Sequence, residues 1–147
     1  MNLNLKTVLL SLAFCVSATS TAYAQPAKAP WPEGAKPYII SPKDGDIITG
    51  AVTVIMGLKG LGVAPAGIEK EKTGHHHILI DVDAPKGDDL QNPLQLDENH
   101  RHFGGGQTET SLNLKTGTHT LQLIMGDHNH IPYNPPLLSD RITVIVK

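Results

Sequence analysis

Cysteine is almost absent from this 147-residue chain, which contains only Cys15. That residue lies in an apolar segment from about Val8 to Val16, which follows a basic start and is succeeded by Ala22-Tyr23-Ala24. This order is typical of a secretory signal peptide. We therefore predict a signal peptide over residues 1–24 and a mature chain without a thiol. Disulfides, thiol catalysis and thiolate metal ligands are then excluded.

The chain also lacks a strong excess of either positive or negative charge. Removal of Lys6 with the signal leaves 12 − 1 = 11 basic and 14 acidic side chains, a net charge of 11 − 14 = −3 with neutral histidine. A slightly acidic chain without a Lys/Arg cluster lacks the electrostatic footprint of a nucleic-acid or anionic-membrane binder. We expect no nucleic-acid partner, and no membrane association once the signal is removed.

Helical periodicity is missing as well. Short β-branched or alternating runs are separated by Gly- and Pro-rich turns instead, and these runs lie at Tyr38–Ile40, Ile47–Gly50, Ala51–Leu58, His76–Val82, Thr108–Leu114, His119–Met125 and Arg141–Lys147. They predict an all-β fold, an immunoglobulin-like β-sandwich of about six to seven strands. The turn Lys115–Thr118 predicts that its two flanking runs form a hairpin.

The predicted mature chain divides into a leader and one domain. Residues 25–37 contain four prolines, which indicate an extended leader. Residues 38–147 are then a single β-sandwich domain, because a segment of this length supports one hydrophobic core.

Histidine is the residue that the chain has in excess, with eight copies. Six of them form three His-x-His pairs: His75 and His77, His100 and His102, and His128 and His130. In a strand, residues two apart point to the same face, with their Cβ atoms roughly 6.5–7 Å apart. Each pair could therefore bind one metal ion. Our hypothesis is that the three pairs meet in the fold and form a metal site.

Nitrogen and oxygen ligands without thiolate suit Cu²⁺ or Zn²⁺. We expect three or four ligands from the six paired histidines, with Asp127 or Asp81 as an oxygen ligand or as the acceptor of an imidazole N–H. Strand alternation places His76 with the aliphatic residues on the core side, so His75 and His77 should point away from the centre of the core. His76 and His119 are expected to be hydrogen-bonded histidines of the core or its edge.

Three motifs resemble a known family: Gly74-His75-His76-His77-Ile78-Leu79-Ile80-Asp81, His102-Phe103-Gly104-Gly105-Gly106-Gln107-Thr108-Glu109-Thr110 and His119-Thr120-Leu121-Gln122-Leu123. Through them the chain is similar to small exported bacterial proteins that share a domain of unknown function. The resemblance covers nearly the whole mature chain. It implies export and a β domain, and it implies no activity.

Three functions remain open. The first, which we favour, is a periplasmic or secreted protein that binds copper or zinc without catalysis. The second is a structural or interaction module of the bacterial envelope, without metal, whose partner is a periplasmic protein. The third is a His-ligated metalloenzyme, which needs an open coordination position and an acid–base group beside it. The first predicts that at least three imidazole nitrogens converge within about 4 to 5 Å of a common point.

Overall fold

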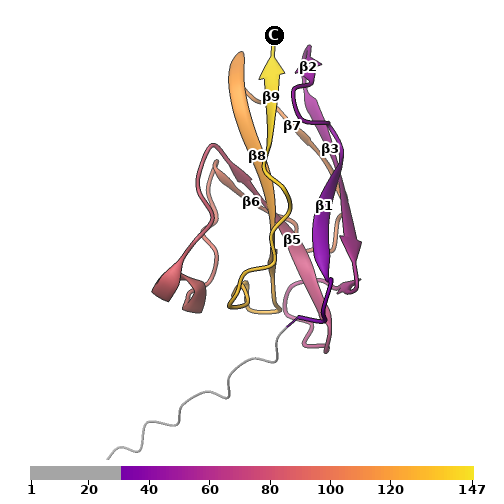
Figure 1. The fold of residues 1–147 in the computed structure, drawn as a ribbon, viewed down its shortest axis with the longest axis vertical. Coiled ribbons are helices and arrows are strands. Elements are labelled where there is room, and N and C mark those ends of the chain that lie inside the picture. The colour runs from indigo at the N-terminus through magenta and orange to yellow at the C-terminus, as the bar shows by residue number, and fades with distance from the viewer. Residues whose placement is uncertain (1–30) are drawn as a thin grey trace, which may run out of the picture.

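The computed structural model describes residues 31–147, which form an all-β, sandwich-like fold (Figure 1). The predicted signal peptide and residues 25–30 of the predicted leader lie outside these residues. The elements are β1 (Lys36–Ser41), β2 (Ile47–Ile48), β3 (Val52–Lys59), β4 (Gly62–Val63), β5 (Thr73–Ile80), the 3-10 helix η1 (Gly87–Gln91), β6 (His100–His102), β7 (Glu109–Leu112), β8 (Gly117–Gly126) and β9 (Ile142–Val146). Within residues 31–147, no helix is long and apolar enough to cross a membrane.

Two sheets make up the sandwich. The smaller sheet has the order β1-β3-β7, and the larger has the order β2-β9-β8-β5-β4, with β6 also paired to β5. Strand β5 is antiparallel to β8 along most of its length, while its other edge pairs with β4 near its start and with β6 near its end. Three of the nine strands have only two or three residues, which is why alternation in the sequence indicated fewer.

The main hydrophobic core lies between the sheets. It contains alternate residues of β3, β5, β8 and β9, which point inward because side chains in a strand alternate between faces: Val52, Val54, Met56, Ile78, Ile80, Leu121, Leu123, Val144 and Val146, joined by Phe103 and Leu112. The predicted alternation of β5 is therefore confirmed, since Ile78 and Ile80 face this core.

A second, smaller apolar cluster covers the outer face of the larger sheet. It consists of Leu79 from β5, Ile124 from β8 and Leu94 from the connection between β5 and β6. That connection, which includes η1, extends beside β6 on the side away from β1 and β3 (Figure 1). The outer face of β5 is therefore buried as well, and this includes the positions of His75 and His77.

The predicted hairpin between the runs around residues 108–114 and 119–125 is wrong. Strand β7 pairs with β3 in the smaller sheet, whereas β8 pairs with β5 and β9 in the larger one. The chain crosses from one sheet to the other between them. Both runs alternate because each has one face toward the shared core, so their pattern could not distinguish pairing within a sheet from packing between sheets.

Candidate metal centre

Four imidazole rings meet on the outer face of the larger sheet: His75 and His77 from β5, His102 at the end of β6 and His130 in the loop after β8. The centroids of every pair among these rings are 4.5–5.9 Å apart. Register explains part of this arrangement, because His77 lies directly opposite His102 in the β5–β6 pair. We call these four residues the outer cluster.

The polar atoms of the outer cluster face one another. The Nε2 atoms of His75 and His77 are 3.0 Å apart, and the Nε2 atoms of His102 and His130 are 3.1 Å apart. One ligand atom each from His75, His77 and His102 lies within 4.8 Å of the others, so these three residues could hold a metal ion. Bonds of about 2.0–2.1 Å in a tetrahedral site place ligand nitrogens about 3.3 Å apart, so small side-chain adjustments would bring the three atoms into position.

Two glycines keep space for these rings. A Cβ atom on Gly104 would lie 2.3 Å from Cε1 and 2.5 Å from Nε2 of His102. A Cβ atom on Gly126 would lie 2.9 Å from Nε2 of His77 and 3.3 Å from Cα of His130. The role of Gly126 was missed, although a glycine at the end of an apolar strand, directly before Asp127-His128, is a local signal for it.

His130 reaches the cluster through an unusual backbone conformation. Its φ angle is 66°, in the left-handed region that non-glycine residues seldom adopt. Hydrogen bonds within the loop hold it there: the His130 N–H donates to the Asp127 carbonyl, and the Asp127 Oδ1 atom accepts from the N–H groups of Asn129 and Ile131. Conformations of this kind are concentrated at functional sites, where surrounding contacts offset their cost.

Burial keeps the two β5 histidines of the cluster in the neutral, metal-binding form. Burial, and after it the neighbouring imidazoles, lower the pKa of His75 to about 4 and that of His77 to about 2, while the Asp127 carboxylate acts in the opposite direction on His75. Burial and then His130 also lower the pKa of His102. Neutral imidazole is the form that binds metals, so near pH 7 His75 and His77 offer unprotonated ligands.

The other predicted ligands lie outside the cluster. His100 lies opposite Leu79, two residues further along β5 than His77, and its Nδ1 atom is 2.8 Å from Oδ1 of Asp97. His128 accepts a hydrogen bond at Nε2 from the Asn129 side-chain amide, and its Nδ1 atom is 4.0 Å from Oδ2 of Asp127. Asp127 is buried beside the cluster, where its carboxylate influences His75 and organises the loop that carries His130.

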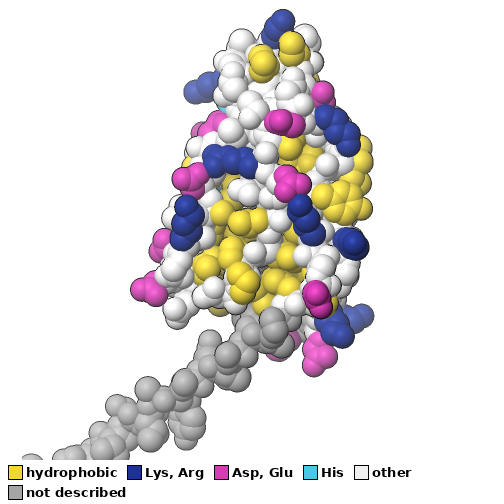
Figure 2. Space-filling model, viewed as in Figure 1, with side chains coloured by type: hydrophobic (Ala, Val, Ile, Leu, Met, Phe, Trp, Pro, Cys, Tyr) yellow, Lys and Arg dark blue, Asp and Glu magenta, His cyan; other side chains and the backbone are white. Residues whose placement is uncertain are grey.

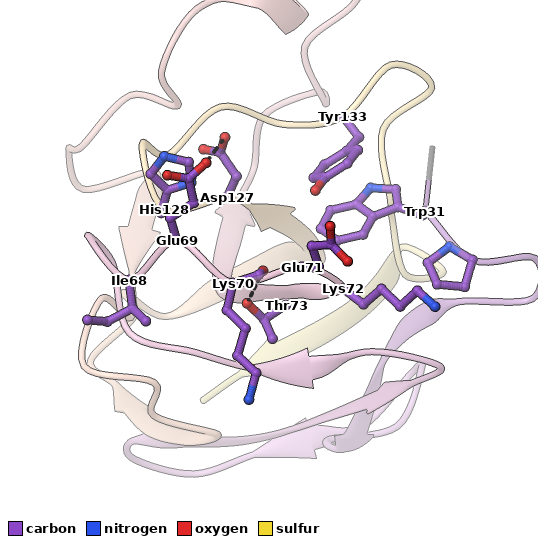
Figure 3. Close-up of a pocket in the computed structure, with 11 residues that line it drawn as sticks. Trp31, Ile68, Glu69, Lys70, Glu71, Lys72, Thr73, Asp127, His128 and Tyr133 are labelled. Carbon is purple, nitrogen blue, oxygen red and sulfur yellow. Dashed lines mark hydrogen bonds and ion pairs between the residues drawn. The ribbon is translucent and has the colours of Figure 1, made fainter. Parts of the chain in front are cut away.

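A cavity of about 360 Å³ adjoins this loop (Figure 3). Asp127, His128 and Glu69 gather on one side of it, and the rings of Trp31 and Tyr133 pack together on the other, with centroids 3.5 Å apart. The face drawn in Figure 2 carries interspersed charges of both signs and shows almost no histidine. Three of the eight histidines, His75, His76 and His77, are buried, and the other five are partly exposed.

His119 lies at the edge of the core, and both of its ring nitrogens have hydrogen-bond partners, as expected. Its Nδ1 atom is 2.7 Å from Oδ2 of Asp81, and its Nε2 atom is 2.8 Å from the Lys115 carbonyl oxygen. Both partners only accept hydrogen bonds while the carboxylate is ionised, so both ring nitrogens must carry a proton. The hydrogen bond with Asp81 accordingly raises the pKa of His119 above its usual value, while burial acts against it. Asp81 therefore pairs with His119 and not with the outer cluster.

We expect His119→Gln to destabilise the protein by about 1 kcal/mol at pH 6 and by less at pH 9. A folded-state pKa above the unfolded value of about 6.5 stabilises the fold below that pH, and the contribution is lost as the pH rises through the folded pKa. Urea unfolding of both proteins at the two pH values measures this difference. Equal destabilisation at pH 6 and pH 9 would show that the ring is not charged.

The expectation for His76 was wrong in part. Its side chain is fully buried in the inner face of β5, as predicted, but neither ring nitrogen has a hydrogen-bond partner. Strand alternation placed the ring correctly, since it depends only on the backbone. A partner on another strand could not be deduced from it.

Fold and site together define a β-sandwich protein with a cluster of four histidines, two of them buried, on the outer face of its larger sheet. The chain belongs to the family described as Domain of unknown function (DUF4399), whose model matches residues 54–147. This region contains all four histidines of the outer cluster. Comparison with curated proteins and comparison with solved structures gave no match.

Proposed function

We propose that this protein is an exported, non-catalytic binder of a divalent transition metal, Cu²⁺ or Zn²⁺, held by the outer cluster. The observation that carries the proposal is the convergence of His75, His77 and His102, whose ligand atoms lie within 4.8 Å of one another, with the Nε2 atom of His130 3.1 Å from that of His102. Imidazole nitrogen is a preferred ligand of both metals. Export is supported by the signal-peptide pattern in residues 1–24.

Binding is favoured over catalysis by the number of ligands. Structural zinc sites are four-coordinate and closed, whereas catalytic sites have three protein ligands and an open position. His75, His77 and His102 offer three ligand atoms within 4.8 Å of one another, and His130, whose Nε2 atom is 3.1 Å from that of His102, is the candidate for the fourth ligand. The Nε2 atoms of the buried residues His75 and His77 contact each other, and a cation would give both of them a favourable partner.

The test is calorimetric titration of the untagged, chelator-treated protein with Zn²⁺ and with Cu²⁺ at pH 7.5. We expect one ion per chain, and a loss of affinity of about 100-fold or more in His77→Ala, because a ligand is removed from the centre of the cluster. His100→Ala and His128→Ala are matched controls: they remove imidazoles outside the cluster and should bind like the wild type. No binding by the wild-type protein would instead favour a metal-free envelope module.

A further inference from the structure

The inner face of β5 carries a third buried imidazole, that of His76, whose ring has no hydrogen-bond partner. Both ring nitrogens of His76 are inaccessible to solvent and lack a partner. A buried polar group without a partner costs on the order of 1–3 kcal/mol. A neutral imidazole in this state also presents an unused lone pair.

A thioether lies directly opposite this imidazole. His76 and Met125 face each other in the antiparallel β5–β8 pair, where Cβ atoms of opposed residues are about 4.5–5.5 Å apart. Met125 is fully buried, yet it belongs to neither apolar cluster formed by the described residues. We therefore place the Met125 side chain beside His76 and outside the aliphatic core.

An indole completes these surroundings. The Met125 methyl carbon Cε and the Trp31 ring atom Cη2 lie 3.5 and 3.2 Å from the point that a Cβ atom on Gly74 would occupy. Gly74 precedes His76 by two residues and so shares its face of β5. The thioether of Met125 and the indole of Trp31 therefore both lie over Gly74, which has no side chain. The unpartnered ring of His76 is on the same face of β5. The Trp31 Nε1 atom is also buried without a partner.

We propose that His76 and Met125 form a second metal site, for a soft monovalent cation, Cu⁺ or Ag⁺, beside the Trp31 ring. Thioether sulfur selects Cu⁺ over hard cations, and the face of an indole attracts a cation. A single charge is also less costly to bury between neutral ligands than a double charge. The site lies on the opposite face of β5 from the outer cluster and does not depend on it.

The experiment follows the methionine methyl groups of the full protein by NMR during titration with Ag⁺, which resists the oxidation that complicates Cu⁺. Binding at the proposed site shifts the Met125 methyl signal and the His76 ring nitrogens and leaves the methyl signal of Met56, in the main core, in place. In Met125→Leu, which conserves volume, the His76 response should need at least about tenfold more Ag⁺. Met56→Leu makes the same chemical change elsewhere in the core and should respond like the wild type.

Three results would overturn the proposal. They are a Met125 methyl signal that stays in place at saturating Ag⁺, methyl signals of Met125 and Met56 that move together, and a Met125→Leu protein that responds like the wild type. The His77→Ala protein separates this site from the outer cluster. Its Met125 response to Ag⁺ should be retained even though its binding of divalent metal is lost.

Discussion

Gly104→Ala should lower the affinity of the protein for Zn²⁺ or Cu²⁺ by about 100-fold while leaving the fold intact. The added methyl group would lie 2.3 Å from Cε1 of His102, a separation that non-bonded atoms do not tolerate. The imidazole is the end of a side chain that can rotate, so it is expected to leave the cluster, and the backbone need not move. The φ angle of Gly104 is not in the left-handed region, so alanine fits the backbone there.

The matched control for this substitution is the next residue. A methyl group on Gly105 would meet only the side chain of Gln107, which is exposed and can move away. Gly105→Ala should therefore bind metal like the wild type in the same calorimetric titration, with unfolding by urea as the check on stability. If Gly104→Ala binds as tightly as Gly105→Ala, His102 is not a ligand and the outer cluster has at most three members.

The part of the site that the sequence predicts best depends on strand geometry alone. Alternation in β5 places His75 and His77 on one face and Ile78 on the other, and the structure has them there. Only local backbone geometry is needed for this prediction, because the side-chain period of a strand is two residues. The position of His102 depends in addition on the register of β6 against β5, which no local pattern reveals.

The other two His-x-His pairs show where spacing stops being informative. In each pair only the second histidine joins the cluster. His100 lies at the start of a three-residue strand, where Asp97 accepts hydrogen bonds from its backbone N–H and holds its ring. His128 and His130 lie in a loop, and the positive φ of His130 redirects its ring. Equal spacing therefore gives a shared face within a strand, as for His100 and His102, but it does not bring both rings to one site.

Acidification from pH 7 to pH 5 should destabilise the metal-free protein by several kcal/mol. Burial lowers the pKa values of His75 and His76 to about 4 and that of His77 to about 2, and neighbouring imidazoles contribute for His75 and His77. The unfolded chain takes up protons below a pKa of about 6.5, whereas the folded chain does not until the pH is much lower. Stability therefore falls as the pH decreases below about 6.5, by about 2 kcal/mol at pH 5 for each of these buried rings.

Urea unfolding at pH 7, 6 and 5 in the presence of a chelator measures this effect, and His76→Leu identifies its source. Leucine has no group to protonate, so this variant should lose about a third of the pH dependence. It should also be at least as stable as the wild type at pH 7, because the unpartnered ring nitrogens are gone. A wild-type urea midpoint that is the same at pH 5 and pH 7 would show that the buried rings reach solvent protons without unfolding, contrary to the packing of β5 between two apolar layers.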